Sequence, residues 1–183
     1  RISQATAFPI CQESIDTLMA LALSNSRDTT SVTGTPAGLE ELQKALTLAT
    51  SIGDQSALVR IRNQMGDIHL QAGQYPQASN RHERALELAR SLNEPSLIGA
   101  SLNGLGRAEA ALGSSQSAIA WHTQALEVFN AAGETAGAAA TFLDLGYVHL
   151  KTSQFSPAQA SFSAGADLYR GLADAVGEAR ALL

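Results

Sequence analysis

Apolar residues recur along most of the chain with the three- and four-residue spacing of an amphipathic helix. Ile98, Leu102, Leu105 and Leu112 follow one another at intervals of four, three and seven residues. These intervals place all four side chains on one helical face, whereas a half-buried strand would need alternating apolar and polar residues. Residues 118–129 carry a second stripe of the same kind, and polar residues occupy the other faces. The pattern therefore predicts helices and no strands.

The helical segments are separated by residues that accept the left-handed conformation in which helices often end. Gly73 and Gly113 stand between the two helices of a pair, and Gly53, Asn93 and Gly133 stand between consecutive pairs. Each unit is therefore predicted to be a helical hairpin. The first helices are expected at 56–72, 96–112 and 136–152, and the second helices at 76–92, 116–132 and 156–172. An earlier pair is expected at 9–24 and 39–52.

The hairpins repeat with a period of 40 residues, which is the step between Gly66, Gly106 and Gly146. Self-similarity at such a period is typical of a stacked array. Small residues at these positions would let the two helices of a hairpin approach closely, so Gly106→Leu is expected to destabilise the chain by overpacking. The chain is predicted to form a single array over residues 1–183. Its expected parts are a degenerate or capping repeat at 9–54 with a long mobile loop at 25–38, regular repeats at 55–94, 95–134 and 135–174, and the truncated start of a further helix at 175–183.

The repeat unit resembles the tetratricopeptide repeat. The second repeat supplies Leu105 and Gly106 in its first helix, then Ala118, His122 and Ala125 in its second helix, which matches the family's skeleton of small and aromatic residues. The period is longer than the usual 34 residues, as in a 40-residue subclass of the family. The resemblance implies an all-α fold, a right-handed superhelical array (α-solenoid) of antiparallel helical hairpins. It also implies a role in binding protein partners.

Composition narrows the function classes. The net charge of −5 argues against nucleic acid or an anionic membrane as a partner, because such surfaces need clustered lysines and arginines. No stretch approaches the length of a membrane-spanning apolar helix. Cys11 is the only cysteine, which excludes an intramolecular disulfide and favours a cytoplasmic, reducing setting. The chain begins without methionine and ends within an expected helix, so we expect a module of a larger protein.

Residues that could carry chemistry are explained by the repeat. His69 and His149 share one repeat position, and His82 and His122 share another, which favours packing over metal binding. No serine lies in a Gly-x-Ser-x-Gly setting, and Cys11 has no evident histidine partner. We therefore predict that the chain is not an enzyme and needs no cofactor or metal.

The concave groove lined by first helices is the predicted binding surface, because the resembled family binds peptides there. Asn63 and Asn103 are suited to contact the backbone of an extended peptide, and arginines and Lys151 to contact acidic groups. An ordinary solvated surface explains the same residues equally well. The candidate groove residues are Arg60, Asn63, Asp67, Gln71, Asn103, Arg107, Leu143, Tyr147 and Lys151.

Three possible functions stay open at this point. The leading hypothesis is a non-catalytic scaffold or adaptor that binds a peptide or helix of a protein partner. The alternative is a regulatory or sensing array of a multidomain transcriptional or signalling protein. A third possibility is self-association through Val176–Leu183. The first regular repeat is also rich in arginine, which could orient a partner or simply be solvated. These arginines are Arg60, Arg62, Arg81, Arg84 and Arg90.

Overall fold

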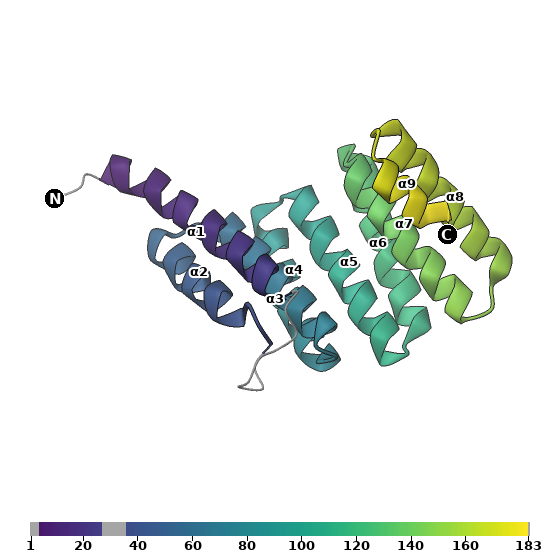
Figure 1. The fold of residues 1–183 in the computed structure, drawn as a ribbon, viewed down its shortest axis with the longest axis horizontal. Coiled ribbons are helices and arrows are strands. Elements are labelled where there is room, and N and C mark those ends of the chain that lie inside the picture. Colours follow the sequence, from purple (N-terminus) through teal and green to yellow (C-terminus); the bar gives the residue numbers. More distant parts are fainter. Residues whose placement is uncertain (1–3, 27–35, 183) are drawn as a thin grey trace. The chain divides into compact units, whose positions relative to one another are not determined.

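The computed structural model describes residues 4–26 and 36–182, and the side chains of residues 11–26 and 36–182. Within these ranges every regular element is an α-helix (Figure 1). The helices are α1 (Gln4–Ser26), α2 (Leu39–Ile52), α3 (Gln55–Gln71), α4 (Tyr75–Leu92), α5 (Pro95–Leu112), α6 (Ser115–Ala132), α7 (Thr135–Lys151), α8 (Phe155–Gly171) and α9 (Ala175–Leu182). The predicted helices of the three regular repeats agree with α3 to α8 to within one residue at each end.

The irregular first pair differs more from its prediction. The helix α1 begins at Gln4, ahead of the expected start at residue 9, and ends at Ser26. The expected long loop at 25–38 is therefore shorter at its start, and its central residues 27–35 lie outside the described residues. The helix α2 occupies the predicted range and starts after Gly38, whose φ of 91° is left-handed.

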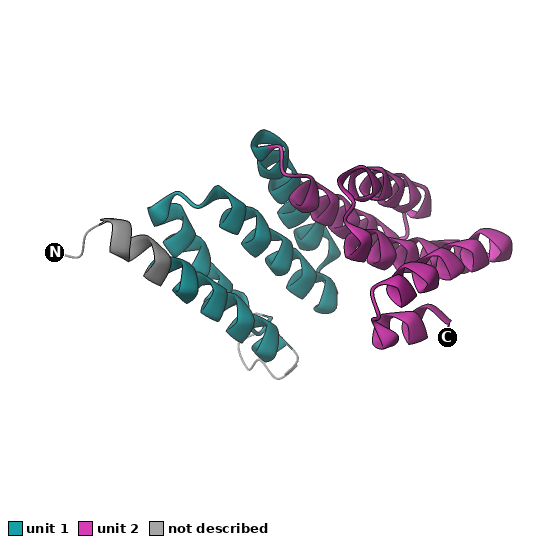
Figure 2. Cartoon of the chain, turned by 90° about the horizontal axis from the view of Figure 1, so that it is seen from above, with its two compact units in different colours: residues 1–92 teal, residues 93–183 magenta. Residues whose placement is uncertain are grey.

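Consecutive helices pack as hairpins: α1 with α2, α3 with α4, α5 with α6, and α7 with α8, while α9 packs on α8. The chain forms two compact units, residues 1–92 with α1 to α4 and residues 93–183 with α5 to α9 (Figure 2). The all-α hairpin fold is thus confirmed. The assignment of all 183 residues to a single array stays a prediction.

The connections between helices share one backbone feature at a step of 20 residues. Gly53, Gly73, Asn93, Gly113 and Gly133 have the left-handed φ that their residue types predicted, with values from 54° to 88°. Ser153 and Ala173 adopt the same conformation, with φ of 59° and 55°, although neither residue type favours it. Geometry imposed by the repeat therefore overrides local preference at these two positions.

Ser153→Gly is expected to raise the free energy of unfolding by about 0.5 to 1 kcal/mol, because glycine carries no Cβ penalty at this φ. The gain is limited by the larger conformational entropy of glycine in the unfolded chain. Gly113→Ser is the matched control, since it places a serine at the equivalent left-handed position between α5 and α6. Urea denaturation should show midpoints that move in opposite directions, and a shift of both midpoints in the same direction would contradict the argument.

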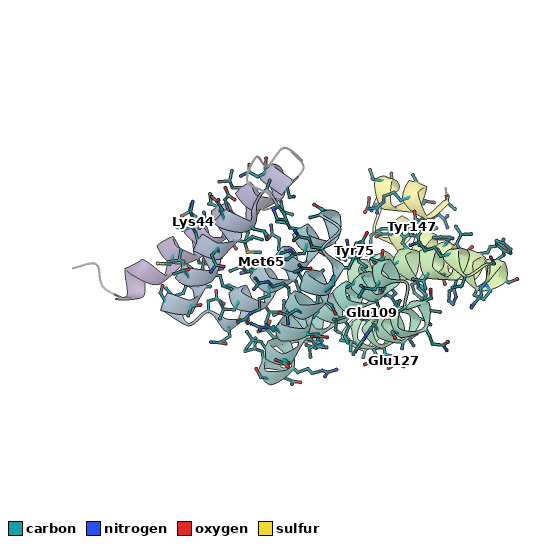
Figure 3. The ribbon with its side chains drawn as sticks, turned by 90° about the horizontal axis from the view of Figure 1, so that it is seen from below. Lys44, Met65, Tyr75, Glu109, Glu127 and Tyr147 are labelled. Atoms are coloured by element: carbon teal, nitrogen blue, oxygen red, sulfur yellow. The ribbon has the colours of Figure 1, made fainter. Side chains whose placement is uncertain are left out.

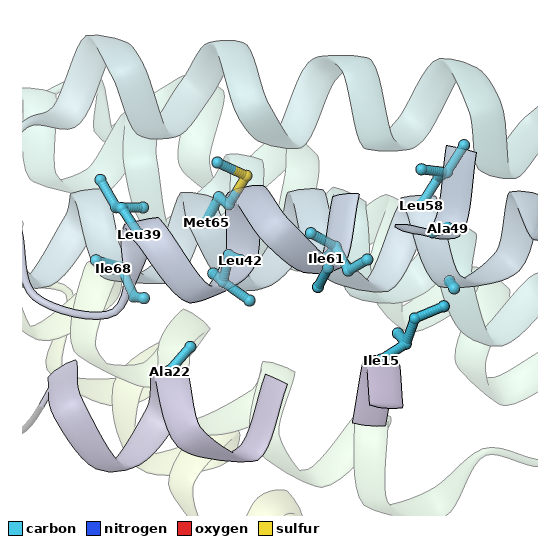
Figure 4. Packing of buried hydrophobic residues seen from close by; sticks show 11 residues of the cluster. Ile15, Ala22, Leu39, Leu42, Ala49, Leu58, Ile61, Met65 and Ile68 are labelled. Carbon is cyan, nitrogen blue, oxygen red and sulfur yellow. The ribbon is translucent and has the colours of Figure 1, made fainter. Parts of the chain in front are cut away.

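The core of the first unit is a cluster of aliphatic side chains between α1, α2 and α3 (Figure 4). Ile15 and Ala22 of α1, Leu42 of α2 and Ile61 of α3 are completely buried. Small residues such as Ala45 let the helices approach closely, and Met65 fills the space that remains. The irregular first pair is therefore attached to the first regular repeat by apolar burial.

The glycines that mark the 40-residue step lie where the two helices of each hairpin come closest. A Cβ built on Gly66 would lie 2.5 Å from Nε2 of His82, and a Cβ on Gly106 would lie 2.5 Å from Cε1 of His122. On Gly146 it would lie 2.6 Å from Cε1 of Phe162. A planar ring thus covers each glycine, which confirms the close approach predicted for these positions.

Candidate functional site

The buried histidines of the first two regular repeats are held by asparagines of the predicted groove. His82 Nδ1 lies 3.1 Å from Asn63 Oδ1, and His122 Nδ1 lies 2.7 Å from Asn103 Oδ1. The two rings are 1% and 0% exposed. Since an amide oxygen only accepts, Nδ1 of each ring carries the proton. Both asparagines therefore use this oxygen inside their own hairpin.

The third repeat replaces the asparagine–histidine pair with apolar side chains. Leu143 stands at the asparagine position and Phe162 at the histidine position. Leu143 is 3% exposed and packs with Ala139 and Tyr169 in a core cluster. It therefore has almost no exposed area for a partner.

One further residue lies beside each ring. Asp67, Arg107 and Tyr147 share this repeat position but differ in chemistry from one hairpin to the next. Asp67 Oδ1 lies 3.9 Å from His82 Nε2. Arg107 acts on His122 electrostatically. Tyr147 meets Phe162 edge to face, with ring centroids 5.2 Å apart and an angle of 75°. An acid, a base and an aromatic residue thus occupy equivalent places, so the three hairpins present different surfaces on one scaffold.

The environment of His122 keeps its ring neutral. Burial, together with the smaller effect of the nearby Arg107 guanidinium, lowers the pKa of His122 to about 4. Asn103, which accepts from His122, also donates from Nδ2 to Asp144 Oδ2 at 2.9 Å. The result is a directed series of hydrogen bonds from α6 through α5 to α7. His122 Nε2 is left as a buried acceptor with no hydrogen-bond partner among the described residues.

This series lies at the wall of a small hollow formed by α5, α6 and α7 within the second unit, with a volume of about 180 Å³. Three of the predicted groove residues, Arg107, Tyr147 and Lys151, line it together. Tyr147, labelled in Figure 3, is 49% exposed, and Lys151 is also exposed. The other lining residues are Ala110, Ala111, His122, Asp144 and Val148.

Sequence reasoning did not assign Asp144 and His122 to this site. The repeat predicts His122 to be a packing residue, which it is, and its ring also forms part of the wall. Asp144 stands at the repeat position of Gln64 and Gly104. A carboxylate at a position that is amide or glycine in the other repeats was the available signal.

The remaining predicted residues lie in the first unit. Arg60 pairs with Asp16 of α1 at 3.3 Å, and both side chains are about half exposed, so the pair adds little stability. Asn63 and Asp67 converge on His82. Gln71 is exposed at the end of α3. Of the nine predicted residues, this unit holds these four, and the second unit holds the other five.

The described side chains contain no group of three or more histidine, cysteine, aspartate or glutamate residues that could hold a metal ion. No described helix has both the length and the apolar character needed to cross a membrane.

Comparison with known proteins decides the family. The family model for the tetratricopeptide repeat matches residues 35–91 and 97–171, which is more than half of the chain. The chain belongs to the tetratricopeptide repeat family. A search of curated protein sequences found no match. The hairpins of this tetratricopeptide repeat chain share the family's fold, but the side chains that they present differ from one hairpin to the next.

Solved structures similar to this tetratricopeptide repeat chain share its fold at low sequence identity. Aspartyl phosphate phosphatase F from Bacillus subtilis is 16% identical with a TM-score of 0.76, over 90% of this chain and 42% of that protein. The tetratricopeptide repeat domain of Arabidopsis FLU is 20% identical with a TM-score of 0.57, over 61% of this chain and 93% of that domain. A signal transduction ATPase with a tetratricopeptide repeat sensor from Pyrococcus horikoshii is 14% identical with a TM-score of 0.68, over 97% of this chain and 28% of that protein.

The tetratricopeptide repeat chain thus spans less than half the length of the phosphatase and about a quarter of the ATPase that it matches. At these identities the similarity establishes the helical-repeat fold alone. The family itself is consistent with a protein-interaction scaffold.

Proposed function

We propose that this chain is a non-catalytic interaction module that binds an acidic peptide segment of a protein partner on the first helices of its second unit. The observation that carries the proposal is the hollow between α5 and α7, which collects Arg107, Tyr147 and Lys151. The residues on the first helices of the other unit, Arg60, Asn63, Asp67 and Gln71, are proposed as a further polar contact surface of that unit.

The chemistry of the hollow favours a carboxylate-bearing ligand. Two cationic side chains, Arg107 and Lys151, stand against the single carboxylate of Asp144, which already accepts a hydrogen bond from Asn103. An arginine fork binds a carboxylate through two parallel hydrogen bonds. The small side chains of Ala110 and Ala111 leave room, and the half-exposed ring of Tyr147 offers apolar contact. A volume of about 180 Å³ suits one side chain or a peptide terminus.

Arg107→Glu with Lys151→Glu is expected to weaken peptide binding by about tenfold or more, because loss of a hydrogen bond to a charged group has an effect of this size. Peptides selected from a random displayed library on the unchanged protein would serve as ligands, and fluorescence anisotropy would give the affinities. Asn103 is left unchanged in this test because its hydrogen bonds support the hairpin.

Arg90→Glu is the matched control, since Arg90 is an exposed arginine of α4 in the other unit. Circular dichroism would establish that each variant keeps its helices. Peptides that bind the double variant and the unchanged protein equally well would refute the proposed surface.

A sensing role is the second candidate, because 97% of this chain aligns with part of a signal transduction ATPase that has a tetratricopeptide repeat sensor. An output domain encoded in the same gene would favour this role. Self-association through α9 also stays a proposal, based on Val176 and Leu182, which are 72% and 66% exposed. Light scattering that shows a monomer at all concentrations would exclude it.

A further inference from the structure

The first unit contains a hollow of its own, formed by α3 and α4, whose lining includes none of the predicted groove residues. Its volume is about 410 Å³. Most of its lining comes from hydrogen-bond donors, two arginines and two amides of α4, with no carboxylate among them. The lining residues are His69, Pro76, Gln77, Asn80, Arg81 and Arg84.

Two arginines, Arg81 and Arg84, line this hollow, and their charges act on a third arginine, Arg62 of α3. Burial lowers the pKa of Arg62, and the nearby charges of Arg84 and Arg81 lower it further. Such like-charge proximity destabilises the fold unless a counterion relieves it. Among the described residues, Arg62, Arg81 and Arg84 form no ion pair and no hydrogen bond, although Glu83 and Glu87 are exposed on the same helix. Although the chain is negatively charged overall, no described acidic side chain forms an ion pair with this cluster.

The hairpin architecture does not require these charges. The positions of Arg62, Arg81 and Arg84 hold Leu102, Trp121 and Gln124 in the second repeat. In the third repeat they hold Phe142, Ser161 and Ala164. All six of these residues are uncharged, and Leu102 is 2% exposed. The arginine cluster is therefore particular to one repeat and has no role in packing that the other hairpins share.

We propose that this hollow binds a phosphate monoester, presented as a phosphorylated serine or threonine of a partner protein. A phosphoryl group carries about −1.5 to −2 charge and three strong acceptor oxygens, which suits the two arginines of the lining, with the charge of Arg62 close to them, better than a single carboxylate does. Arg81 and Arg84 supply guanidinium forks, and the amides of Gln77 and Asn80 supply neutral donors. Nucleic acid is disfavoured because the net charge of −5 repels an extended polyanion.

His69 closes one side of this hollow and is not proposed as a ligand. Its Nδ1 lies 2.7 Å from Gln74 Oε1, so the ring donates there. The ring is 8% exposed. His69 therefore fixes the junction of α3 with α4, and the contacts to the phosphoryl group come from α4.

The test uses a short glycine-rich peptide that contains one phosphoserine, together with its serine and glutamate versions and inorganic phosphate. Calorimetry at low ionic strength should show saturable binding of the phosphopeptide that is tighter than that of the serine and glutamate peptides. Arg81→Gln with Arg84→Gln should weaken that binding by about tenfold or more, and Arg81→Lys by less, since lysine keeps the charge but loses the fork. Arg90→Gln, which removes an exposed arginine of the same helix outside the hollow, should leave the affinity unchanged.

Removal of mutually repelling charges should not impair folding, which thermal unfolding of each variant would establish. Equal binding of the phosphopeptide to the double variant and the unchanged protein would overturn the proposal, and so would the absence of saturable binding. If inorganic phosphate binds as tightly as the phosphopeptide, the inference that a partner protein presents the phosphoryl group would be overturned. Equal binding of the glutamate peptide would overturn the selectivity for phosphate.

Discussion

Gly106→Leu is expected to lower the free energy of unfolding by about 3 kcal/mol, at the upper end of the usual cost of overpacking. A Cβ alone at this position would lie 2.5 to 2.7 Å from three atoms of the His122 ring. That ring is completely buried and tied to Asn103, so moving it aside would break this hydrogen bond. Urea denaturation followed by circular dichroism would measure the loss.

Gly106→Ala separates overpacking from helix propensity, which act in opposite directions. Alanine is favoured over glycine within a helix by about 1 kcal/mol, so a net loss would show that the steric cost is larger. Gly171→Ala is the control, because a Cβ at Gly171 meets nothing within 4 Å. We expect that control to be neutral or slightly stabilising. Equal effects at the two glycines would contradict the close approach of α5 and α6.

The regular part of the fold was predictable from sequence because three independent signals coincide there. Apolar spacing, turn residues and the 40-residue step all place the same boundaries, and α3 to α8 agree with them. Ser153 and Ala173 carry no turn signal of their own, yet their positions follow from the step. The start of α1 was missed because that pair lacks a regular counterpart, so only local spacing was available.

The candidate site was predictable by position but not by environment. The family resemblance placed Arg107, Tyr147 and Lys151 on first helices, and the structure brings them together at one hollow. The repeat pattern does not reveal which side chain already forms a hydrogen bond within its own hairpin, as Asn103 does with His122. Nor does it show that Leu143 turns inward. Both outcomes depend on the residue across the hairpin, which differs between the second and third repeats.

Acidification from pH 7 to pH 4 is expected to destabilise the second unit through His122 by about 3 kcal/mol. Burial and Arg107 lower the pKa of this ring to about 4 in the folded chain, against 6.5 for the ordinary group. Between these values the unfolded chain binds the proton and the folded chain does not, so stability falls as the pH decreases. The contribution is complete above pH 6.5 and is lost once the pH reaches about 4. Urea midpoints measured at successive pH values would follow it.

The third repeat supplies the variant that isolates this effect from the titration of carboxylates. Asn103→Leu with His122→Phe installs in the second repeat the apolar pair that Leu143 and Phe162 form in the third. The double variant should still fold, because a phenylalanine ring already packs over Gly146 in the same geometry. Its stability should decline less than that of the unchanged protein between pH 6.5 and pH 4. Parallel pH profiles for the two proteins would show that the ring of His122 accepts a proton in the folded state, and the argument that burial keeps it neutral would fail.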